Sequence, residues 1–493
     1  MTASDLPYSS IAGASAAIDR LEVSPVALIE AVLARIDALD ARLNAYVRLT
    51  RDSALAEAHA AEERARSGHR RSSLDGIPIA VKDLIDTAGV VTAAGTGAYH
   101  DRVPAADAEA VRRLREAGAV IVGKTNTHEL AWGGTTNNRH FGATHSPWRL
   151  DRVPGGSSGG SGVAVAAGLA LGALGTDTGG SIRIPAANCG VTGFKPTFGL
   201  VGRTGVVPLA ATLDHVGPLA RSALDCALLL DVLAGPDASD PDSEARPPDP
   251  YAASLLATPA GLEGVRLAVI PALLAGCEPP VLEAFERSLE ELRRLGATVE
   301  RLDPLPGRTG EEVRALVVTI ISVEAAATFG ALAAERGHLM SRPIRERLEA
   351  ARAIPAVDYR RALDARREVE RRCEAAVRDG RFDAFVVPTS PVQPEAIAPD
   401  PEEEPDVPLR FRNTSLFNAT RQPALSVPSG LDPEGLPTGL MFAGARWTDA
   451  LVLRIGHAYQ RATTHHLERP PLDVPQSPRP GFGGNAEEKA RPQ

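Results

Sequence analysis

Two serines that follow glycine are the residues best suited to chemistry in this sequence. Ser157 lies in the run 155–161 (GGSSGGS), and Ser181 lies 24 positions later (181 minus 157), in the run 175–183 (GTDTGGSIR). Because glycine has no side chain, backbone N–H groups and a serine hydroxyl can approach a substrate closely in such runs. Successive N–H groups in a turn also bind an anion, which is what the oxyanion of acyl transfer needs.

A serine hydroxyl is a weak nucleophile, so this chemistry also needs a base. Lys82, in the run 76–83 (GIPIAVKD), is the best candidate. A lysine acts as a base only when neutral, so its pKa must fall from about 10.4, and the apolar run 77–81 is compatible with the burial that lowers it. Taken alone, Lys82 could be a surface lysine, and 155–161 a flexible linker or a phosphate-binding loop. A P-loop is excluded because no lysine follows the glycines.

Together these motifs resemble the amidase signature family, whose members hydrolyse amides with a Ser–cis-Ser–Lys triad. The resemblance extends from about Ser24 to about Gln460. It implies that Ser181 is the acylated nucleophile, that Ser157 relays the proton after a cis bond to Gly156, and that Lys82 is the general base. It also implies an oxyanion hole built from the N–H groups of Thr178, Gly179, Gly180 and Ser181.

The residues around this set have supporting roles. Asp177 and Arg183 flank the nucleophile, and we predict that they form an ion pair that fixes the turn rather than act on the substrate. We expect Gly179 and Gly180 to tolerate little change, because an oxyanion donor contributes about 3 kcal/mol. By resemblance, the substrate pocket draws on Trp132, Gly133, Gly134 and Thr135 and on segments 317–329 and 411–422.

Three other interpretations compete with this one. Residues 156–160 match the nucleophile elbow G-x-S-x-G around Ser158, but residues 145–154 cannot form the strand that an elbow needs, so we reject it. The run 154–196 is similar to the glutaminase (A-type) subunit of a tRNA-dependent amidotransferase. However, 320–324 lacks the expected tyrosines and 411–413 offers no acidic group for the α-amino group of glutamine. We therefore favour a free-standing amidase, with the glutaminase subunit of an amidotransferase as the alternative. A non-enzymatic binding module is a further alternative, against which the filled triad argues.

Composition limits the partners. The chain has 493 residues, 44% hydrophobic and 23% charged, and its net charge of −9 argues against nucleic acid as the main partner. Its four cysteines are scattered, which predicts buried free thiols in a reducing compartment. No metal or cofactor is implied, since H-E-x-x-H fails at Trp132. The N-terminus lacks a signal peptide and no uninterrupted apolar stretch approaches 18 residues, so we expect a cytoplasmic protein with a small-molecule amide substrate and no membrane partner. A homodimer is our working hypothesis.

The remaining sequence alternates between strand and helix patterns. Helices are predicted at 25–39, 51–66, 107–117, 161–167, 281–295 and 450–461, and strands at 77–81, 119–122, 265–270, 297–302, 385–387, 424–427 and 440–443. Segments 234–250 and 393–408 are predicted loops. We predict an α/β protein: a single large domain with a central twisted mixed β-sheet covered by helices on both faces. Residues 1–70 would form a helical segment packed on the core, 71–468 the catalytic domain, and 469–493 a disordered tail.

Overall fold

One mixed sheet runs through the whole protein. The computed structural model describes residues 5–257, 260–302, 308–379, 381–403, 407 and 409–472. Across the sheet the strands are β1 (Tyr46–Leu49), β3 (Val120–Thr125), β2 (Pro78–Lys82), β6 (Gly172–Asp177), β8 (His215–Ala220), β7 (Thr192–Lys195), β12 (Ala424–Leu431), β13 (Pro437–Gly444), β11 (Ala384–Pro388), β9 (Arg266–Val269) and β10 (Thr298–Arg301). A separate hairpin pairs β4 (Asn137–Asn138) with β5 (Gly142–Ala143).

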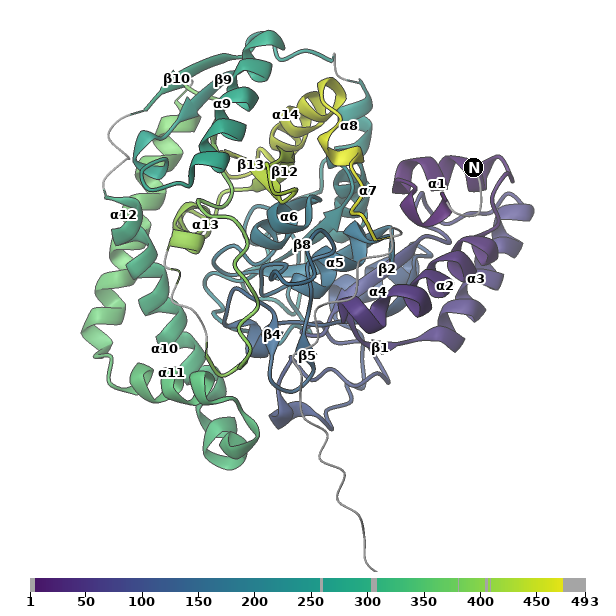
Figure 1. The fold of residues 1–493 in the computed structure, drawn as a ribbon, viewed down its shortest axis with the longest axis horizontal. Helices are drawn as coiled ribbons and strands as arrows, with labels where there is room; N and C mark the ends of the chain where they lie inside the picture. Colours follow the sequence, from purple (N-terminus) through teal and green to yellow (C-terminus); the bar gives the residue numbers. More distant parts are fainter. Residues whose placement is uncertain are drawn as a thin grey trace, which may run out of the picture.

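Parallel and antiparallel pairs occur in separate blocks along this sheet. β2 pairs in parallel with both β3 and β6, so the strand that carries Lys82 lies beside the strand that leads to Ser181. β8, β7, β12 and β13 then pair antiparallel, and β9 returns to parallel pairing with β11 and β10. Helices cover both faces (Figure 1), which confirms the predicted α/β class with a single mixed sheet.

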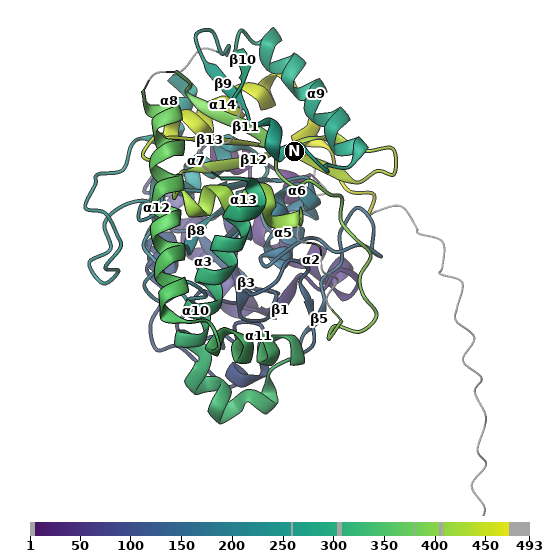
Figure 2. The same cartoon turned by 90° about the vertical axis from the view of Figure 1, so that its left-hand side faces the viewer.

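The helices fall into groups around the sheet. They are α1 (Ile11–Asp19), α2 (Pro25–Leu43), α3 (Arg51–Arg66), α4 (Glu109–Glu116), α5 (Gly159–Ala166), α6 (Arg183–Cys189), α7 (Ala223–Leu233), α8 (Tyr251–Ala257), α9 (Pro279–Arg294), α10 (Gly310–Arg336), α11 (Arg342–Arg352), α12 (Ala356–Arg378), α13 (Leu409–Ala419) and α14 (Asp449–Ala462). In Figure 1, α1–α3 lie at one end of the molecule and α10–α12 at the other. Figure 2, turned toward the second group, shows α10 and α12 side by side.

Local sequence signals explain the elements that were predicted well. Ser24 caps α2, since its Oγ accepts a hydrogen bond from Ala27 N at 3.3 Å, and Pro25 occupies the first turn. The predicted strand–helix–strand is β9–α9–β10, with boundaries shifted by one or two residues. Gly296 follows α9 with φ +96°, a conformation that suits glycine.

Several elements are not evident from the sequence pattern. β6 contains two glycines and reads as a turn, and α10, α11 and α12 were not assigned. Among the described residues, one helix, Gly310–Leu339, is long and apolar enough to cross a membrane by length and composition, with a mean hydropathy of 1.9. The sequence-based expectation of no membrane span rested on the lack of an uninterrupted apolar stretch near 18 residues, and Glu324 does interrupt the apolar run of this helix. That expectation stays a prediction. In the structure this helix packs against α11, α12 and α13.

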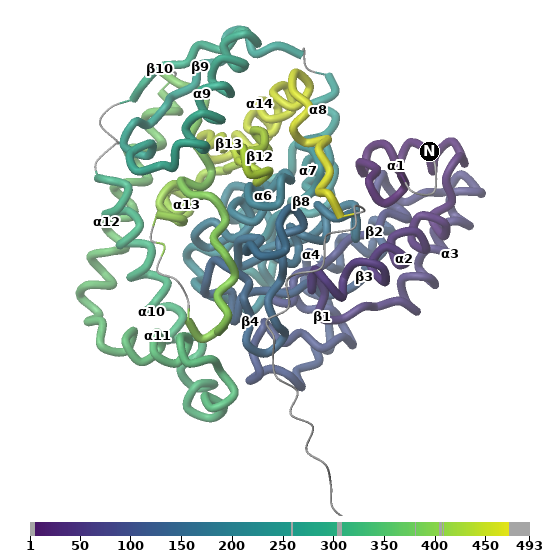
Figure 3. Tube along the Cα trace, in the orientation of Figure 1, coloured from purple at the N-terminus to yellow at the C-terminus, as the bar shows by residue number. Residues whose placement is uncertain are grey.

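The predicted loop 234–250 is confirmed, because it contains no helix or strand, whereas the other predicted irregular segments are only partly described. Within 393–408, the described residues form no helix or strand, and 404–406 and 408 lie outside the described residues. Of the predicted tail, 473–493 also lies outside them. Arg469 lies 4.4 Å from the Tyr8 ring centroid, so both ends of the described chain meet beside α1 (Figure 3).

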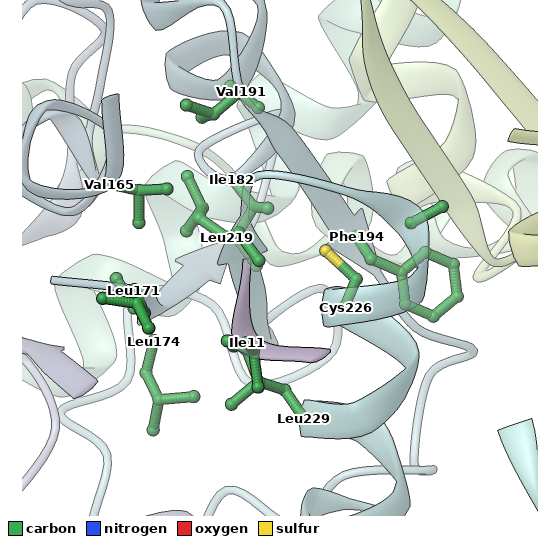
Figure 4. Close-up of a cluster of buried hydrophobic side chains, with 14 of the residues drawn as sticks. Ile11, Val165, Leu171, Leu174, Ile182, Val191, Phe194, Leu219, Cys226 and Leu229 are labelled. Atoms are coloured by element: carbon green, nitrogen blue, oxygen red, sulfur yellow. The ribbon is translucent and has the colours of Figure 1, made fainter. Parts of the chain in front are cut away.

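The core lies between the sheet and the helices that cover it. Figure 4 shows part of it, where Ile11 of α1, Leu174 of β6, Leu219 of β8 and Cys226 of α7 meet below Ile182. Ile182 directly follows Ser181, so this packing holds the segment that carries the predicted nucleophile. All four cysteines are buried free thiols, as predicted.

Candidate active site

Lys82 ends β2 in the interior of the protein. Its side chain is completely buried, and its Nζ lies 2.8 Å from Ser157 Oγ, 2.9 Å from Ser158 Oγ and 2.7 Å from Thr176 Oγ1. Burial lowers the pKa of Lys82 to about 7, although the negative charges of Asp177 and Asp214 oppose this shift. A substantial fraction of Lys82 is therefore neutral near neutral pH and able to accept a proton.

Ser157 lies two residues before α5, and its peptide bond to Gly156 is cis, as the resemblance implied. A side chain at Gly156 would not fit, because its Cβ would lie 2.8 Å from the carbonyl carbon of Gly134. Ser157 is fully buried, and its carbonyl accepts hydrogen bonds from His128 N at 3.1 Å and Thr127 Oγ1 at 2.9 Å.

Ser158 also contacts the lysine, a role that its sequence context does not indicate. Its hydroxyl donates to the Thr176 carbonyl at 3.2 Å and accepts from Lys82, and the side chain is fully buried. It does not line the cavity next to Ser181. The placement agrees with the rejection of a nucleophile elbow, since no strand precedes Ser158 in 145–157.

Ser181 lies in the turn between β6 and α6. Its carbonyl accepts a hydrogen bond from Ser158 N at 3.3 Å, so the two serine segments are adjacent, and its side chain lines a cavity. Within the described part of the chain, no group accepts a hydrogen bond from the N–H groups of Thr178, Gly179, Gly180 and Ser181. This turn thus offers free donors beside a serine hydroxyl, the arrangement that an oxyanion requires.

The two glycines of this turn differ in their tolerance. Gly180 has φ +141°, and a Cβ there would lie 2.3 Å from Thr414 Oγ1. At Gly179 a Cβ would meet only Ser415 Oγ at 3.7 Å and Phe411 Cδ1 at 3.8 Å, which are ordinary contacts. The structure therefore gives a steric reason for intolerance at Gly180 but none at Gly179, and the expectation that both tolerate little change because of their oxyanion donors stays a prediction.

Asp177 and Arg183 form a fully buried ion pair, with Asp177 Oδ1 2.8 Å from Arg183 Nη2. Arg183 also donates to the Thr414 carbonyl at 3.0 Å and to Asn418 Oδ1 at 2.6 Å, so it joins the nucleophile turn to α13. Burial alone would raise the pKa of Asp177, but the guanidinium of Arg183 holds it well below its usual range.

Asp214 is a further buried carboxyl that supports the turn. Its Oδ1 accepts from Thr178 Oγ1 at 2.6 Å, and its Oδ2 accepts from the N–H groups of Leu209 and Ala210. Burial raises the pKa of Asp214 to about 6. The neighbouring His215 is buried beside Lys195, with 3.2 Å between His215 Nε2 and Lys195 Nζ, and burial lowers its pKa well below the usual value.

A cavity of about 410 Å³ opens beside Ser181. Its walls come from several elements that are remote in sequence: Ala131, Trp132, Gly133, Gly134, Thr178, Gly179, Ser181, Leu209, Arg314, Val317, Val318, Ile321, Ser322, Arg347, Val407, Arg410, Phe411 and Ser415. These described lining residues include three arginines and no Asp or Glu.

The predicted pocket residues are partly placed on this cavity. Trp132, Gly133 and Gly134 line it, but Thr135 does not, because its Oγ1 turns to His128 Nδ1 at 3.3 Å. From segment 317–329 the cavity is lined by Val317, Val318, Ile321 and Ser322, and from segment 411–422 by Phe411 and Ser415. Phe329 packs instead into a separate core cluster. Sequence reasoning missed Arg314, Arg347 and Arg410, which lie on three different helices and belong to no motif.

Among the described residues, no group of three or more His, Cys, Asp or Glu side chains is arranged to hold a metal ion.

Comparison with known proteins decides the family. The family model described as Amidase matches residues 27–453. The chain belongs to the amidase family. One curated relative is the A-type subunit of the glutamyl-tRNA(Gln) amidotransferase of Chloroflexus aggregans (strain MD-66 / DSM 9485). It is 37% identical over 489 residues, which cover 95% of this chain and 99% of the relative.

Solved structures of other amidases share the fold. A bacterial aryl acylamidase of the amidase signature family superposes with a TM-score of 0.86 at 27% identity, covering 95% of this chain and 99% of its own. The peptide amidase from Stenotrophomonas maltophilia superposes with a TM-score of 0.81 at 34% identity, covering 95% of this chain and all of its own (100%). Relatives that act on different amides thus share this architecture, which leaves substrate choice to the cavity walls.

Proposed function

We propose that the protein hydrolyses a carboxamide C–N bond through an acyl-enzyme on Ser181. The observation that carries this proposal is the buried Lys82, whose Nζ lies 2.8 Å from Ser157 Oγ and whose pKa is lowered to about 7. A lysine with this pKa is neutral often enough to act as a base. It contacts Ser157, and the next residue, Ser158, donates its N–H to the Ser181 carbonyl.

In the proposed reaction, Ser181 Oγ attacks the amide carbon while its proton passes to Ser157 Oγ. Ser157 gives its own proton to Lys82. The N–H groups of Thr178, Gly179, Gly180 and Ser181 stabilise the oxyanion. As the C–N bond breaks, the proton returns through Ser157 to the leaving amine. Water then attacks the acyl-enzyme and passes a proton through Ser157 to Lys82. This proton returns through Ser157 to Ser181 Oγ as the acid leaves.

Two measurements test this mechanism. A serine-reactive fluorophosphonate should label the wild-type protein at Ser181, as located by peptide mass spectrometry, and Ser181→Ala should lose both labelling and amide hydrolysis. Labelling at Ser158 in the wild type, or full activity in Ser181→Ala, would contradict the proposal. Because metal is given no role, a chelator should leave the rate unchanged.

We propose that the enzyme acts on its own as a free-standing amidase in the cytoplasm. Support comes from the cavity, since none of the described residues that line it is an Asp or Glu, so these residues offer no carboxylate for the α-ammonium of glutamine. The test is ammonia or amine release from a panel of primary amides, anilides and glutamine by the purified chain alone.

A second function is the glutaminase component of a tRNA-dependent amidotransferase. The names of the curated relatives support it better than they support a free-standing enzyme, since these relatives are A-type components of amidotransferases at 37–39% identity over most of both chains. In this case ammonia would come from glutamine alone. Mixing the chain with the other components of a bacterial amidotransferase would then give glutamine-dependent amidation of Glu-tRNA(Gln). Hydrolysis of other amides without any such amidation would exclude it.

A further inference from the structure

We propose that Lys195 and His215 are positioning residues of the oxyanion hole. Hydrogen bonds lead from Lys195 through His215 to the carbonyl of Asp177, and thereby orient and polarise the N–H group of Thr178. This inference rests on the proposed amide hydrolysis and adds two residues that act on it from behind the turn. Lys195 ends β7, His215 begins the neighbouring strand β8, and neither lines the cavity beside Ser181.

A single peptide unit joins these hydrogen bonds to the reacting atoms. The Asp177 carbonyl and the Thr178 N–H belong to the same peptide bond, which is planar and trans, so the two groups point in opposite directions. A donor that holds the carbonyl therefore fixes the direction of the N–H. Thr178 lines the cavity beside Ser181, and its N–H has no acceptor among the described residues.

Two side chains hold the Asp177 carbonyl from behind. His215 Nδ1 lies 3.2 Å from it and 2.6 Å from the Leu213 carbonyl, so its hydrogen is shared between the two oxygens. Asn418 Nδ2 on α13 donates to the same Asp177 carbonyl at 3.2 Å. Since both partners of His215 Nδ1 are carbonyls, which only accept, we assign the ring hydrogen to this nitrogen. The imidazole thus links the start of β8 to the end of β6.

Lys195 supplies the other end of the network. The side chain is completely buried, and its Nζ donates to the Pro196 carbonyl at 3.3 Å, to the Gln422 carbonyl and to His215 Nε2 at 3.2 Å. Three acceptors match the three hydrogens of an ammonium group. Burial lowers the pKa of Lys195 and the pKa of His215 well below their usual values, and the carboxylate of Asp177 opposes both shifts.

The hydrogen bonds of this network strengthen one another. A donor at His215 Nε2 draws electron density from the ring, which makes the Nδ1 hydrogen a better donor to the Asp177 carbonyl. That carbonyl in turn polarises the Thr178 N–H on the opposite side of the peptide. The gain is largest when negative charge develops on the substrate oxygen, so the network should lower the barrier of the reaction more than it strengthens binding of the amide.

The same arrangement recurs in the next peptides of the turn. Thr414 Oγ1 donates to the Gly179 carbonyl at 2.6 Å, which fixes the N–H of Gly180. The Gly180 carbonyl accepts from Ile184 N at 2.8 Å, which fixes the N–H of Ser181. The turn thus holds oxyanion donors through the carbonyls on their far side, and the network at Thr178 differs in that it continues to a buried lysine.

Two substitutions at one position separate the hydrogen-bond donor from the bulk of the ring. Asparagine has an N–H where histidine has Nδ1, so His215→Asn keeps a donor, whereas His215→Leu has none. We expect His215→Leu to lower kcat at least about tenfold while KM stays within about twofold, since complete removal of an oxyanion donor costs about a hundredfold or more. His215→Asn should stay within about threefold of the wild-type kcat, and Lys195→Met should lower kcat about threefold at unchanged KM.

A transition-state analogue gives a measurement that a loss of stability does not change. The aldehyde that corresponds to the best amide of the panel adds to Ser181 Oγ and places an oxyanion among the donors. Across the wild type and the variants, its inhibition constant should rise by the same factor by which kcat/KM falls. Active sites are counted by fluorophosphonate labelling taken to completion, and melting curves verify that each variant folds.

Tyr46→Phe is the matched control. Tyr46 is also buried, and its hydroxyl donates to the backbone carbonyl of Leu169 at 2.9 Å, but that peptide contributes no oxyanion donor. The control should lower the melting temperature and leave kcat and the inhibition constant of the aldehyde unchanged.

The outcomes separate this inference from the proposed function. If Ser181 is not labelled and no amide is hydrolysed, the proposed function fails and this inference fails with it. If amides are hydrolysed and His215→Leu keeps the kcat and the aldehyde affinity of the wild type, only the inference is overturned. Equal losses in His215→Asn and His215→Leu also overturn it, because the donor would then not matter. A lower kcat with unchanged aldehyde affinity overturns it as well.

Discussion

At the scale of single residues, the pKa of Lys82 decides when the proposed base can act. Burial lowers this pKa to about 7, and the neutral amine is the active form. We therefore predict that kcat/KM rises with pH through a midpoint near 7 and levels off above it, because deprotonation creates the base. A pH–rate profile of the free enzyme measures this midpoint. A Lys82→Ala variant that keeps the same rising limb would contradict the assignment.

Asp214 is another buried group near the site that titrates in this range, and burial raises its pKa to about 6. Its negative charge raises the pKa of Lys82, so Asp214→Asn should lower that pKa further and move the rising limb to lower pH. The variant should also slow turnover, since it weakens the hold on Thr178. If the rising limb disappears in Asp214→Asn while turnover remains, the limb belongs to Asp214 rather than to Lys82.

The glycines of the oxyanion turn give a matched pair of variants. Gly180→Ala should reduce kcat by at least about a hundredfold, because the strained backbone and the contact with Thr414 displace donors that contribute about 3 kcal/mol. Gly179→Ala should keep a melting temperature close to that of the wild type, since its Cβ meets only ordinary contacts. Equal losses of stability in both variants would show that the turn is governed by something other than these contacts.

At the scale of elements, Arg183 links the nucleophile turn to α13 and β6. Replacing it with alanine leaves the Asp177 carboxylate buried without its cation, which typically costs about 3–5 kcal/mol of the free energy of unfolding. Urea unfolding of Arg183→Ala measures this loss. Arg360→Ala is the control, because Arg360 pairs with Asp364 on the surface of α12 and is 66% exposed. Its loss should stay below about 1 kcal/mol. Similar losses in both variants would contradict a structural role for the buried pair.

The helices and strands also show which parts of the structure could be predicted from the sequence. Lys82 and the two serine runs could be identified because each lies in a short sequence pattern that is recognisable on its own. Ser24-Pro25 likewise marks the start of a helix, and Gly296 marks the end of one. β6 was missed because its glycines resemble a turn, although pairing with β2 and β8 makes it a strand. The cavity arginines could not be found in this way, since only tertiary packing brings α10, α11 and α13 together.

At the scale of the whole molecule, the N-terminal segment reaches the site. β1 forms an edge of the main sheet, and the Ala45 carbonyl accepts from Asn126 N at 2.8 Å. A Cβ at Gly160, in the first turn of α5, would lie 2.5 Å from that same carbonyl. We therefore predict that a chain starting at residue 71 loses activity and aggregates, because it exposes the edge of β3 and apolar core residues. Size-exclusion chromatography beside the full chain tests this. A monomeric, active truncation would show that residues 1–70 are dispensable.

The three hydroxyls around Lys82 have a consequence for the speed of proton transfer. Ser158 gives its own hydrogen to the Thr176 carbonyl, so toward the amine it can only accept. A charged Nζ can donate one hydrogen to each of Ser157, Ser158 and Thr176, all within 2.9 Å. The amine can therefore gain or lose a proton by exchanging hydrogen positions alone, while every heavy atom stays in place. Proton transfer to this buried amine therefore needs little reorganisation, whereas water around an exposed lysine would have to reorient.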